Sequence, residues 1–242
     1  MAADYHSRRA MSFHVEYPIN ENGRDFVVGD IHGMLKEFQQ ALRLVNFDTK
    51  RDRCFSVGDL IDRGSDSMGC LQLIYKPWFF PVQGNHEQMM LIGLADDSNR
   101  SNFLLWMMNG GTWIHKFKAY PQLLASIFAD VARLPLAITV IRKDGEKVGI
   151  CHAEPPTQDW MQVAGEELDE RACNKMIWGR RHIREKNAPL TKRVLFTVHG
   201  HTIVETPIMV GNALFIDTGA FCTGKITLID IDAVSATQQQ VA

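Results

Sequence analysis

The chain has 242 residues, of which 45% are hydrophobic and 22% are charged, as in an ordinary globular protein. Its formal net charge of −2 gives no global basic field for nucleic acid. No apolar run approaches the roughly 20 residues of a membrane span. The five cysteines include no Cys-x-x-Cys pair, which predicts free thiols in a reducing compartment. We therefore expect a cytoplasmic protein with no membrane or nucleic-acid partner.

The first third of the chain predicts alternating strands and helices. Short β-prone runs predict strands at 24–29, 54–57 and 78–82. Apolar residues at helical spacing predict helices at 34–45 and 66–76. A strand, a helix and a strand within about 30 residues make a βαβ unit, so the first two strands should be parallel.

The rest of the chain changes from helices to strands. Helical patterns separated by a polar turn and by Asn109-Gly110-Gly111 predict helices at 88–95, 101–108 and 121–133. A turn-rich tetrapeptide predicts a hairpin of strands at 136–141 and 147–151. A polar loop at 154–167, a helix at 168–178 and strands at 194–198, 213–216 and 226–231 follow.

The absence of a repeat or a low-complexity linker favours one domain. We predict an N-terminal extension at 1–23, a single domain at 24–234 and a polar C-terminal tail at 235–242.

Polar side chains follow the predicted strands, each closely preceded by a glycine. Asp30 and His32 follow the first strand, Asp59 follows the second, and Asn85 with His86 follows the third. Active-site groups of α/β proteins lie at the carboxyl ends of strands. Residues of the same ligand types follow two later strands, at His152 and His201. We expect these side chains to converge on one site.

Carboxylate, imidazole and amide oxygen ligands together suit Mn²⁺, Fe or Zn²⁺. The ligand set is too large for one ion and suits two divalent ions, for which we favour Mn²⁺. Asp59 lies on the middle of the first three strands, so we expect it to bridge. The first ion is assigned to Asp30, His32 and Asp59, and the second to Asp59, Asn85, His152 and His201.

Formal charge then indicates the substrate. Two dications, two carboxylates and a bridging hydroxide leave about one positive charge, which favours an anionic oxygen ligand. Arg63 lies four residues after Asp59 and adds a guanidinium fork suited to phosphate. These features predict phosphomonoester hydrolysis, with in-line attack by the hydroxide that bridges the two metals.

Five motifs resemble those of metallophosphoesterases in the PPP serine/threonine phosphatase family, and most closely its phage lambda type. They are Gly29-Asp30-Ile31-His32-Gly33, Gly58-Asp59-Leu60-Ile61-Asp62-Arg63-Gly64, Gly84-Asn85-His86-Glu87, Cys151-His152-Ala153 and Gly200-His201-Thr202. The resemblance covers roughly residues 24–232 and includes Ile177-Trp178-Gly179-Arg180. It implies an α/β calcineurin-like fold (α+β in some schemes), a four-layer β-sandwich of mixed sheets flanked by helices.

The resemblance also implies roles for individual residues. His86 would be the general acid that protonates the leaving group, and Asp62 would hold it. Arg63 and Arg180 would clamp the phosphate, with Asn85 also contacting the substrate; the sequence alone does not distinguish Arg180 from Arg181 or Arg184. The implied substrates are proteins or peptides phosphorylated on serine or threonine, with phosphotyrosine as a further candidate.

Several residues depart from the family pattern or have two interpretations. Glu154 and Gln83 replace family residues next to the motifs and could alter substrate preference. His199 could compete as a ligand, but the strand register points it away from the His201 site. Asp217 could support a ligating histidine or cap a turn. The histidines that match no motif are expected to be surface or structural residues: His6, His14, His115 and His182. Three tryptophans are expected to lie in the core or in a groove wall: Trp106, Trp113 and Trp160.

Three other functions are consistent with parts of the pattern. A dinucleoside polyphosphate hydrolase, or another nucleotide phosphohydrolase, would share the metal motifs, but such relatives usually lack the aspartate found here as Asp62. A nuclease of the superfamily usually carries a second histidine where this chain has Ile203. A non-catalytic binding protein should have lost a ligand, and none is missing.

Overall fold

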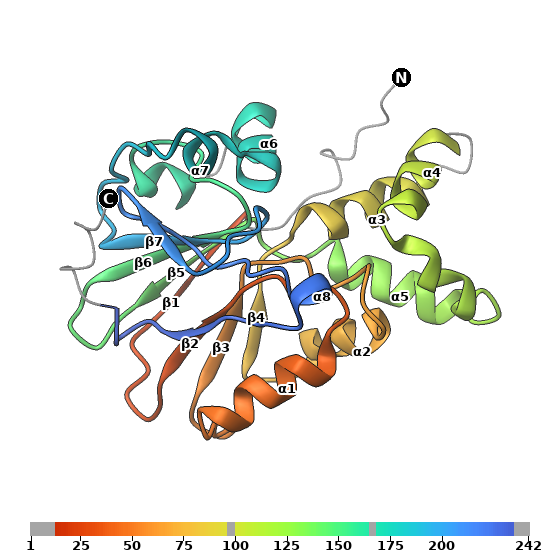
Figure 1. Ribbon diagram of the computed structural model, residues 1–242, viewed down its shortest axis with the longest axis horizontal. Coiled ribbons are helices and arrows are strands. Elements are labelled where there is room, and N and C mark those ends of the chain that lie inside the picture. The colour runs from red at the N-terminus through yellow and green to blue at the C-terminus, as the bar shows by residue number, and fades with distance from the viewer. Residues whose placement is uncertain (1–12, 96–99, 165–167, 235–242) are drawn as a thin grey trace.

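The computed structural model describes residues 13–95, 100–164 and 168–234, and its centre is a pair of β-sheets (Figure 1). The six-stranded sheet has the order β1 (His14–Tyr17), β5 (Ala137–Ile141), β6 (Lys147–Cys151), β7 (Phe196–His199), β9 (Ala213–Phe215) and β8 (Ile208–Val210). The four-stranded sheet has the order β10 (Leu228–Asp230), β2 (Asp25–Val28), β3 (Arg53–Ser56) and β4 (Phe79–Pro81).

The two sheets pack face to face because their strands alternate apolar side chains between two faces. Val27 and Phe55 of the four-stranded sheet share a buried cluster with Ile138 and Val148 of the six-stranded sheet. Val28, next to Val27, points the other way into a cluster that includes Phe38 of a covering helix. Both sheets are therefore buried on their facing sides.

Helices cover the outer faces of this pair and complete four layers (Figure 1). The four-stranded sheet carries α1 (Leu35–Leu44), α2 (Ser67–Leu71) with η1 (Gln72–Tyr75), α3 (Asn85–Ala95), α4 (Arg100–Met108), η2 (Gly111–Phe117) and α5 (Pro121–Val131). The six-stranded sheet carries η3 (Trp160–Ala164) and α6 (Glu170–Trp178), followed in the chain by α7 (Arg181–Glu185). The last short helix is α8 (Ala220–Thr223). The predicted four-layer arrangement of mixed sheets and helices is confirmed.

Strand directions agree with the sequence analysis. β2, β3 and β4 are parallel neighbours, as the predicted βαβ unit requires. β5 and β6 form the predicted antiparallel hairpin. β6, β7 and β9 are parallel, and β10 adds antiparallel to β2. Since β2, β3 and β4 run in one direction, the loops that follow them meet at one edge of their sheet.

The main differences from the predicted elements are short edge segments. His14–Tyr17 lies within the predicted extension, yet it forms β1 and pairs with β5, more than 100 residues away. β8, η2, η3, α7 and α8 were also not predicted. These segments have three to seven residues, and long-range partners stabilise them in place of a strong local pattern. The predicted tail at 235–242 lies outside the described residues, and the single-domain assignment stays a prediction.

In the described part of the chain, no helix has the length and apolar character to cross a membrane.

Candidate functional site

The site lies where loops leave the carboxyl ends of five strands. Asp30 and His32 follow β2, Asp59 follows β3, and Asn85 with His86 begins α3 after β4. His152 follows β6, and His201 follows β7. These seven side chains were predicted to converge, and the structure brings them together. All belong to residues that are at most 6% exposed.

The loops of the site concentrate unusual backbone conformations. Eight described non-glycine residues have positive φ, and five are in this site: His32, Asp59, Asp62, Arg63 and His201. Left-handed backbone costs energy for such residues and is kept where the surrounding structure enforces it.

Gly84 shows how closely these loops approach each other. A Cβ atom at Gly84 would lie 2.4 Å from the Asp59 backbone nitrogen. Only glycine allows this contact between the loops after β3 and β4.

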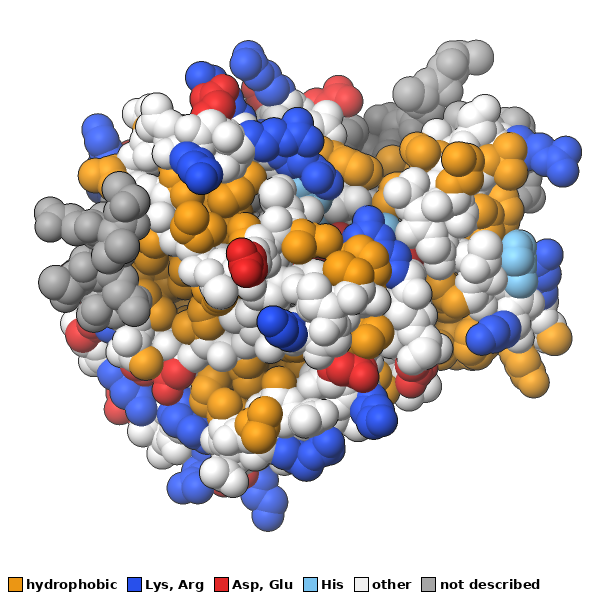
Figure 2. Space-filling view, in the orientation of Figure 1, with side chains coloured by type: hydrophobic (Ala, Val, Ile, Leu, Met, Phe, Trp, Pro, Cys, Tyr) orange, Lys and Arg blue, Asp and Glu red, His pale blue; other side chains and the backbone are white. Residues whose placement is uncertain are grey.

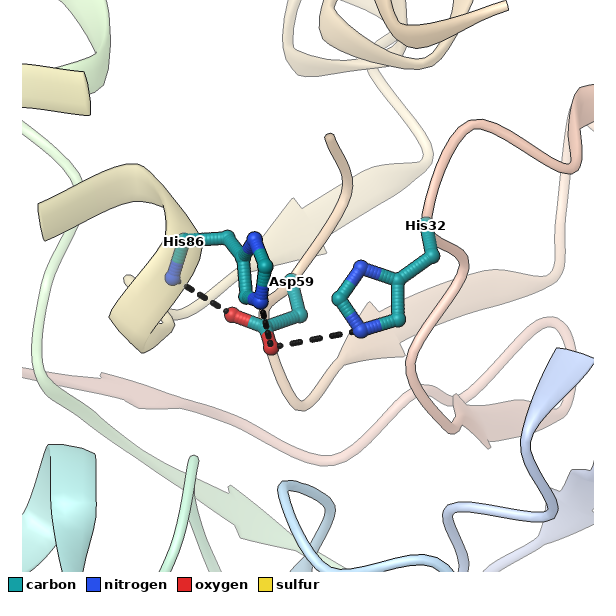
Figure 3. A group of neighbouring side chains, drawn as sticks. All are labelled: His32, Asp59 and His86. Carbon is teal, nitrogen blue, oxygen red and sulfur yellow. Dashed lines mark hydrogen bonds and ion pairs between the residues drawn. The ribbon is translucent and has the colours of Figure 1, made fainter. Parts of the chain in front are cut away.

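Asp59 lies at the centre of the site (Figure 3). Its Oδ2 atom is 3.5 Å from Nε2 of His32, and its Oδ1 atom is 3.5 Å from Nε2 of His152. Oδ1 also accepts a hydrogen bond from the backbone N–H of His86 at 2.9 Å. Burial alone would raise the pKa of Asp59, but His86, through its charge and its backbone N–H, holds it below its usual range. The side chain is therefore a carboxylate that faces imidazoles on two sides.

One group of potential ligands meets at the Asn85 side chain. Its Oδ1 atom lies 2.9 Å from Nε2 of His152 and 2.8 Å from Nδ1 of His201. Nδ1–H of His152 donates to the carbonyl of Val57 at 2.8 Å, so Nε2 carries the lone pair that faces Asp59. This bond fixes the tautomer that a metal ligand needs.

A second group surrounds His32. Nδ1–H of His32 donates to the Ile61 carbonyl at 2.9 Å, which leaves Nε2 as the atom that faces the carboxylates. Nε2 is 4.0 Å from Oδ2 of Asp30, and that oxygen accepts from the backbone N–H of His201 at 3.0 Å. The two groups thus contact each other through backbone as well as through Asp59.

The donor set fits metal ions. Burial lowers the pKa of His152, and it lowers the pKa of His32 and of His201 to about 3, so all three rings are neutral and can offer lone pairs. Ligand atoms held at about 2.1 Å from one ion lie roughly 3–4 Å from one another, which is the spacing that surrounds Asp59. Two sets of ligand atoms that share Asp59 lie within 4.8 Å: His32, Asp59 and His86, and Asp59, His152 and His201. The first set contains His86 where the sequence assignment has Asp30.

His86 is held by a buried carboxylate. Its Nδ1–H donates to Oδ2 of Asp62 at 2.6 Å. Burial alone lowers the pKa of His86, but Asp59 and the hydrogen-bonded Asp62 outweigh that effect and raise it. Nε2 is buried, 4.0 Å from Oδ2 of Asp59, and has no hydrogen-bond partner among the described residues. The proton-carrying edge of the ring therefore faces the site.

Two tryptophans hold Asp62 in turn. The indole N–H of Trp113 donates to Oδ1 of Asp62 at 2.7 Å, and that of Trp106 donates to Oδ2 at 3.0 Å. Sequence analysis placed both tryptophans in the core or in a groove wall and missed this contact. Only the fold brings α4 and η2 against the Asp62 loop, because 44 and 51 residues separate the partners.

Two arginines border the site. Nη1 of Arg63 donates to Nε2 of His32 at 3.0 Å, and its guanidinium lies 4.5 Å from the centre of the Phe221 ring. Nε of Arg180 donates to Nε2 of His201 at 2.9 Å. Arg181 and Arg184 are exposed on α7, so the structure distinguishes Arg180 from them.

Glu87 holds the loop after β3, which carries Asp59. The sequence analysis did not predict this role for Glu87. Its fully buried carboxylate accepts backbone N–H groups from Gly84 at 2.9 Å, Asp59 at 2.9 Å and Leu60 at 2.8 Å. Burial and the nearby Asp59 raise its pKa to about 7. Its position directly after Asn85-His86 was the only available signal. The carboxylate ties the loop after β3 to the start of α3.

We expect Glu87→Gln to destabilise the protein, because an amide cannot accept all three N–H groups and turns a donor toward one of them. The loss should be about 1–3 kcal/mol in the free energy of unfolding. Denaturant unfolding of this variant beside the exposed Glu21→Gln measures it. Equal stability of the two variants would show that the Glu87 contacts contribute little.

Residues with two interpretations in the sequence are now placed. His199 faces away from the site, as its register predicted, with Nε2 2.7 Å from Oγ1 of Thr197. Asp217 caps a turn by accepting the Gly219 N–H at 2.8 Å, and it also contacts Asp30 rather than a histidine. Burial raises the pKa of Asp217 to about 6.

The two departures flanking the motifs serve the scaffold. The side-chain amide of Gln83 donates to the Val131 carbonyl at 3.2 Å at the end of α5. The carboxylate of Glu154 accepts the backbone N–H of His182, which joins the loop after β6 to α7. Both side chains are buried, and these hydrogen bonds join separate elements of the scaffold.

Among the described residues, His14, His115 and Trp160 lie apart from this cluster. His14 and the indole of Trp160 both bond the Thr139 hydroxyl, and His115 is exposed on η2. His6 lies outside the described residues.

Comparison with known proteins agrees with this geometry. Residues 26–204 match the calcineurin-like phosphoesterase family. The chain is 36% identical over 207 residues to serine/threonine-protein phosphatase 1 of Salmonella typhimurium, covering 85% of this chain and 91% of that protein.

Two further similarities are more limited. The symmetrical bis(5'-nucleosyl)-tetraphosphatase of Wigglesworthia glossinidia brevipalpis is 46% identical over 69 residues, which are 28% of this chain and 25% of that protein. A Saccharomyces cerevisiae protein serine/threonine phosphatase with similarity to human phosphatase PP5 has a similar structure. Its TM-score is 0.60 at 18% identity, and the match covers 88% of this chain and 73% of that one.

Proposed function

Because the chain belongs to the calcineurin-like phosphoesterase family, we propose that it is a metal-dependent phosphatase that hydrolyses phosphoserine and phosphothreonine in proteins, with phosphotyrosine as a possible further substrate. The similarity to a serine/threonine-protein phosphatase over 91% of that protein's length supports this substrate class. The observation that carries the proposal is Asp59, whose two carboxylate oxygens each lie 3.5 Å from a histidine on a different side. One carboxylate facing two ligand groups is the arrangement that a pair of ions requires.

In the proposed site, Asp30, His32 and Asp59 would hold one divalent ion, and Asp59, Asn85, His152 and His201 would hold the other. We favour Mn²⁺, with Fe or Zn²⁺ as alternatives, because the set mixes carboxylate, amide and imidazole ligands. Bound divalent ions supply Lewis-acid activation of the attacking water and neutralise the phosphate charge. The chain itself contributes fixed tautomers at His32 and His152 and the rigid loops that carry them.

His86 is the proposed general acid. Asp62 holds Nδ1 and raises the proton affinity of the ring, and Nε2 faces the site without another partner among the described residues. The proton on Nε2 can therefore be transferred to the oxygen of the departing serine or threonine. Asp62 acts through His86 as a positioning residue.

Arg63 and Arg180 are the proposed phosphate clamp, with Asn85 as a further contact. The two guanidinium groups approach the histidines of the two ligand groups from separate loops, at His32 and at His201. A guanidinium offers paired N–H donors that match phosphate oxygens. Their placement lets a phosphate be held from two sides while it lies over the ligand cluster.

The proposed function is tested by hydrolysis assays in Mn²⁺ and in excess chelator. We expect Mn²⁺-dependent hydrolysis of p-nitrophenyl phosphate and of a phosphothreonine peptide, and loss of both rates in chelator. Undiminished activity in chelator would contradict the proposal.

The alternative is a nucleotide phosphohydrolase, favoured by the 46% identity to the symmetrical tetraphosphatase over 69 residues. Diadenosine tetraphosphate assayed beside the phosphopeptide separates the two activities. A much higher kcat/KM for the dinucleotide would replace our proposal with the alternative.

We propose that the enzyme works in the cytoplasm on phosphorylated proteins. Free cysteines, four of them buried, are consistent with a reducing compartment.

The support of Asp62 gives a further prediction. Trp113→Phe removes the shorter indole hydrogen bond to Asp62 while keeping an aromatic ring, so Asp62 and His86 should be held less firmly. We expect kcat for the phosphothreonine peptide to fall about tenfold, one lost hydrogen bond to a charged group being worth about 1.5 kcal/mol. Hydrolysis of p-nitrophenyl phosphate, whose leaving group needs little protonation, should change less. An equal loss with both substrates would indicate a general structural defect.

A further inference from the structure

One flank of the site carries a strong concentration of positive charge. We define the basic flank as residues 171–193, which comprise α6 after its first residue, Glu170, then α7 and the segment that leads toward β7. Figure 2 shows Lys and Arg side chains gathered over α6 and α7. This stretch has eight basic residues and one acidic residue in a chain whose net charge is −2. The basic residues are Arg171, Lys175, Arg180, Arg181, Arg184, Lys186, Lys192 and Arg193.

Most of this charge is not neutralised within the fold. Arg181 pairs with Glu185 at 3.0 Å, and Arg193 pairs with Asp159 at 3.2 Å. Within the described ranges, the structure gives no ion pair to Arg171, Lys175, Arg184, Lys186 or Lys192. A surface of unpaired like charges raises the local concentration of acidic ligands.

The basic flank also contains a polar pocket of about 440 Å³. Lys175 and Arg181 supply positive charge to its wall, and Glu185 supplies one carboxylate, which pairs with Arg181 at 3.0 Å. Thr157 and Asn187 supply neutral polar groups. His182 also lines it, and burial lowers the pKa of its ring, so the positive charge comes from the two longer side chains. Within the described residues Lys175 has no ion-pair partner, so its ammonium group and the neighbouring neutral polar groups suit an acidic side chain.

Two chain segments connect the pocket to the proposed active site. Arg180, bonded to His201, directly precedes Arg181 of the pocket. Pro156 and Thr157 follow His152 by a few residues, and Glu154 between them bonds the backbone of His182. The phosphate clamp and the pocket wall therefore contain consecutive residues of the chain, Arg180 and Arg181.

We propose that the basic flank is a docking surface for an acidic segment of the phosphoprotein substrate, and that its pocket receives an acidic side chain close to the phosphorylated residue. This inference rests on the proposed phosphatase activity and adds a substrate preference to it. Charge complementarity is the supporting argument, because an acidic peptide meets unpaired cations on the flank as well as the phosphate clamp.

The test compares two phosphothreonine peptides of equal length, one with aspartate and glutamate around the phosphothreonine and one with asparagine and glutamine. We expect the wild type to have a KM about 3- to 10-fold lower for the acidic peptide, as two partly exposed charge contacts would give. The difference should shrink as salt increases, because exposed charges are screened. Equal KM values at low salt would overturn the docking proposal.

Variants localise the effect. In Lys175→Gln/Arg181→Gln the acidic preference should disappear, whereas in Lys36→Gln/Arg43→Gln, on the opposite helix α1, it should remain (Figure 1). Charge reversal in Lys175→Glu/Arg181→Glu should favour a peptide flanked by lysine. Equal effects of the flank and α1 variants would contradict the proposal.

Two further measurements separate other outcomes. The rate of p-nitrophenyl phosphate hydrolysis in each preparation reports on the active site alone. If the wild type does not hydrolyse this substrate, the proposed phosphatase activity is contradicted. A normal rate without any peptide preference would defeat only the docking surface. A single-stranded DNA oligonucleotide that competes better than the unphosphorylated acidic peptide would overturn the protein-substrate assignment in favour of nucleic acid.

Discussion

Asp59→Asn should abolish metal binding at the paired site and lower kcat for p-nitrophenyl phosphate by about 10³-fold or more, since the bound ions supply several kcal/mol of transition-state stabilisation. Asparagine keeps the size of the side chain and one oxygen that can accept the His86 N–H. It removes the negative charge, and its amide turns an N–H₂ group toward one of the two histidines. Both ligand groups should therefore lose metal affinity in this variant.

Metal titration by calorimetry, with metal content measured after dialysis, checks the first half of this result. Asp144→Asn is the matched control, because that carboxylate is exposed on the hairpin turn between β5 and β6. The control should bind Mn²⁺ and turn over like the wild type. If the Asp59→Asn enzyme retained two ions and full turnover, the proposed role of Asp59 as the shared ligand would be contradicted.

His86→Asn should keep the metals and lose most turnover on peptides. The variant removes the proposed proton donor but none of the side chains proposed as ligands. General acid catalysis contributes about 10²- to 10⁴-fold, so kcat for a phosphothreonine peptide should fall by that amount. The p-nitrophenolate group departs with little protonation, so kcat for p-nitrophenyl phosphate should fall much less.

This variant also separates two interpretations of His86. Its Nε2 atom lies 4.0 Å from Asp59, and His86 forms a possible ligand set with His32 and Asp59. If His86 were a metal ligand in place of Asp30, the variant would lose metal, and kcat would fall equally for the peptide and for p-nitrophenyl phosphate. His115→Asn, an exposed histidine on η2, is the matched control.

The strand pattern explains how much of the fold could be predicted. β2, β3 and β4 carry local apolar runs, and the helix between the first two is amphipathic, so periodicity located them. β1 has the polar His14 and Glu16 at alternate positions and gains its partners from β5. Its strand state depends on a pairing across more than 100 residues, which no local pattern contains.

In the site, too, some features follow from local sequence and others depend on contacts between distant segments. The sequence by itself determined which residue types follow each strand, and this was enough to predict that six side chains gather around Asp59. Only the tertiary structure decided which groups hold them: Glu87 on the backbone of the Asp59 loop, and two indoles on Asp62. The reason is physical. The ligand residues lie in short motifs that are visible in the sequence, whereas a buried hydrogen bond needs two partners whose positions are set by the packing of separate elements.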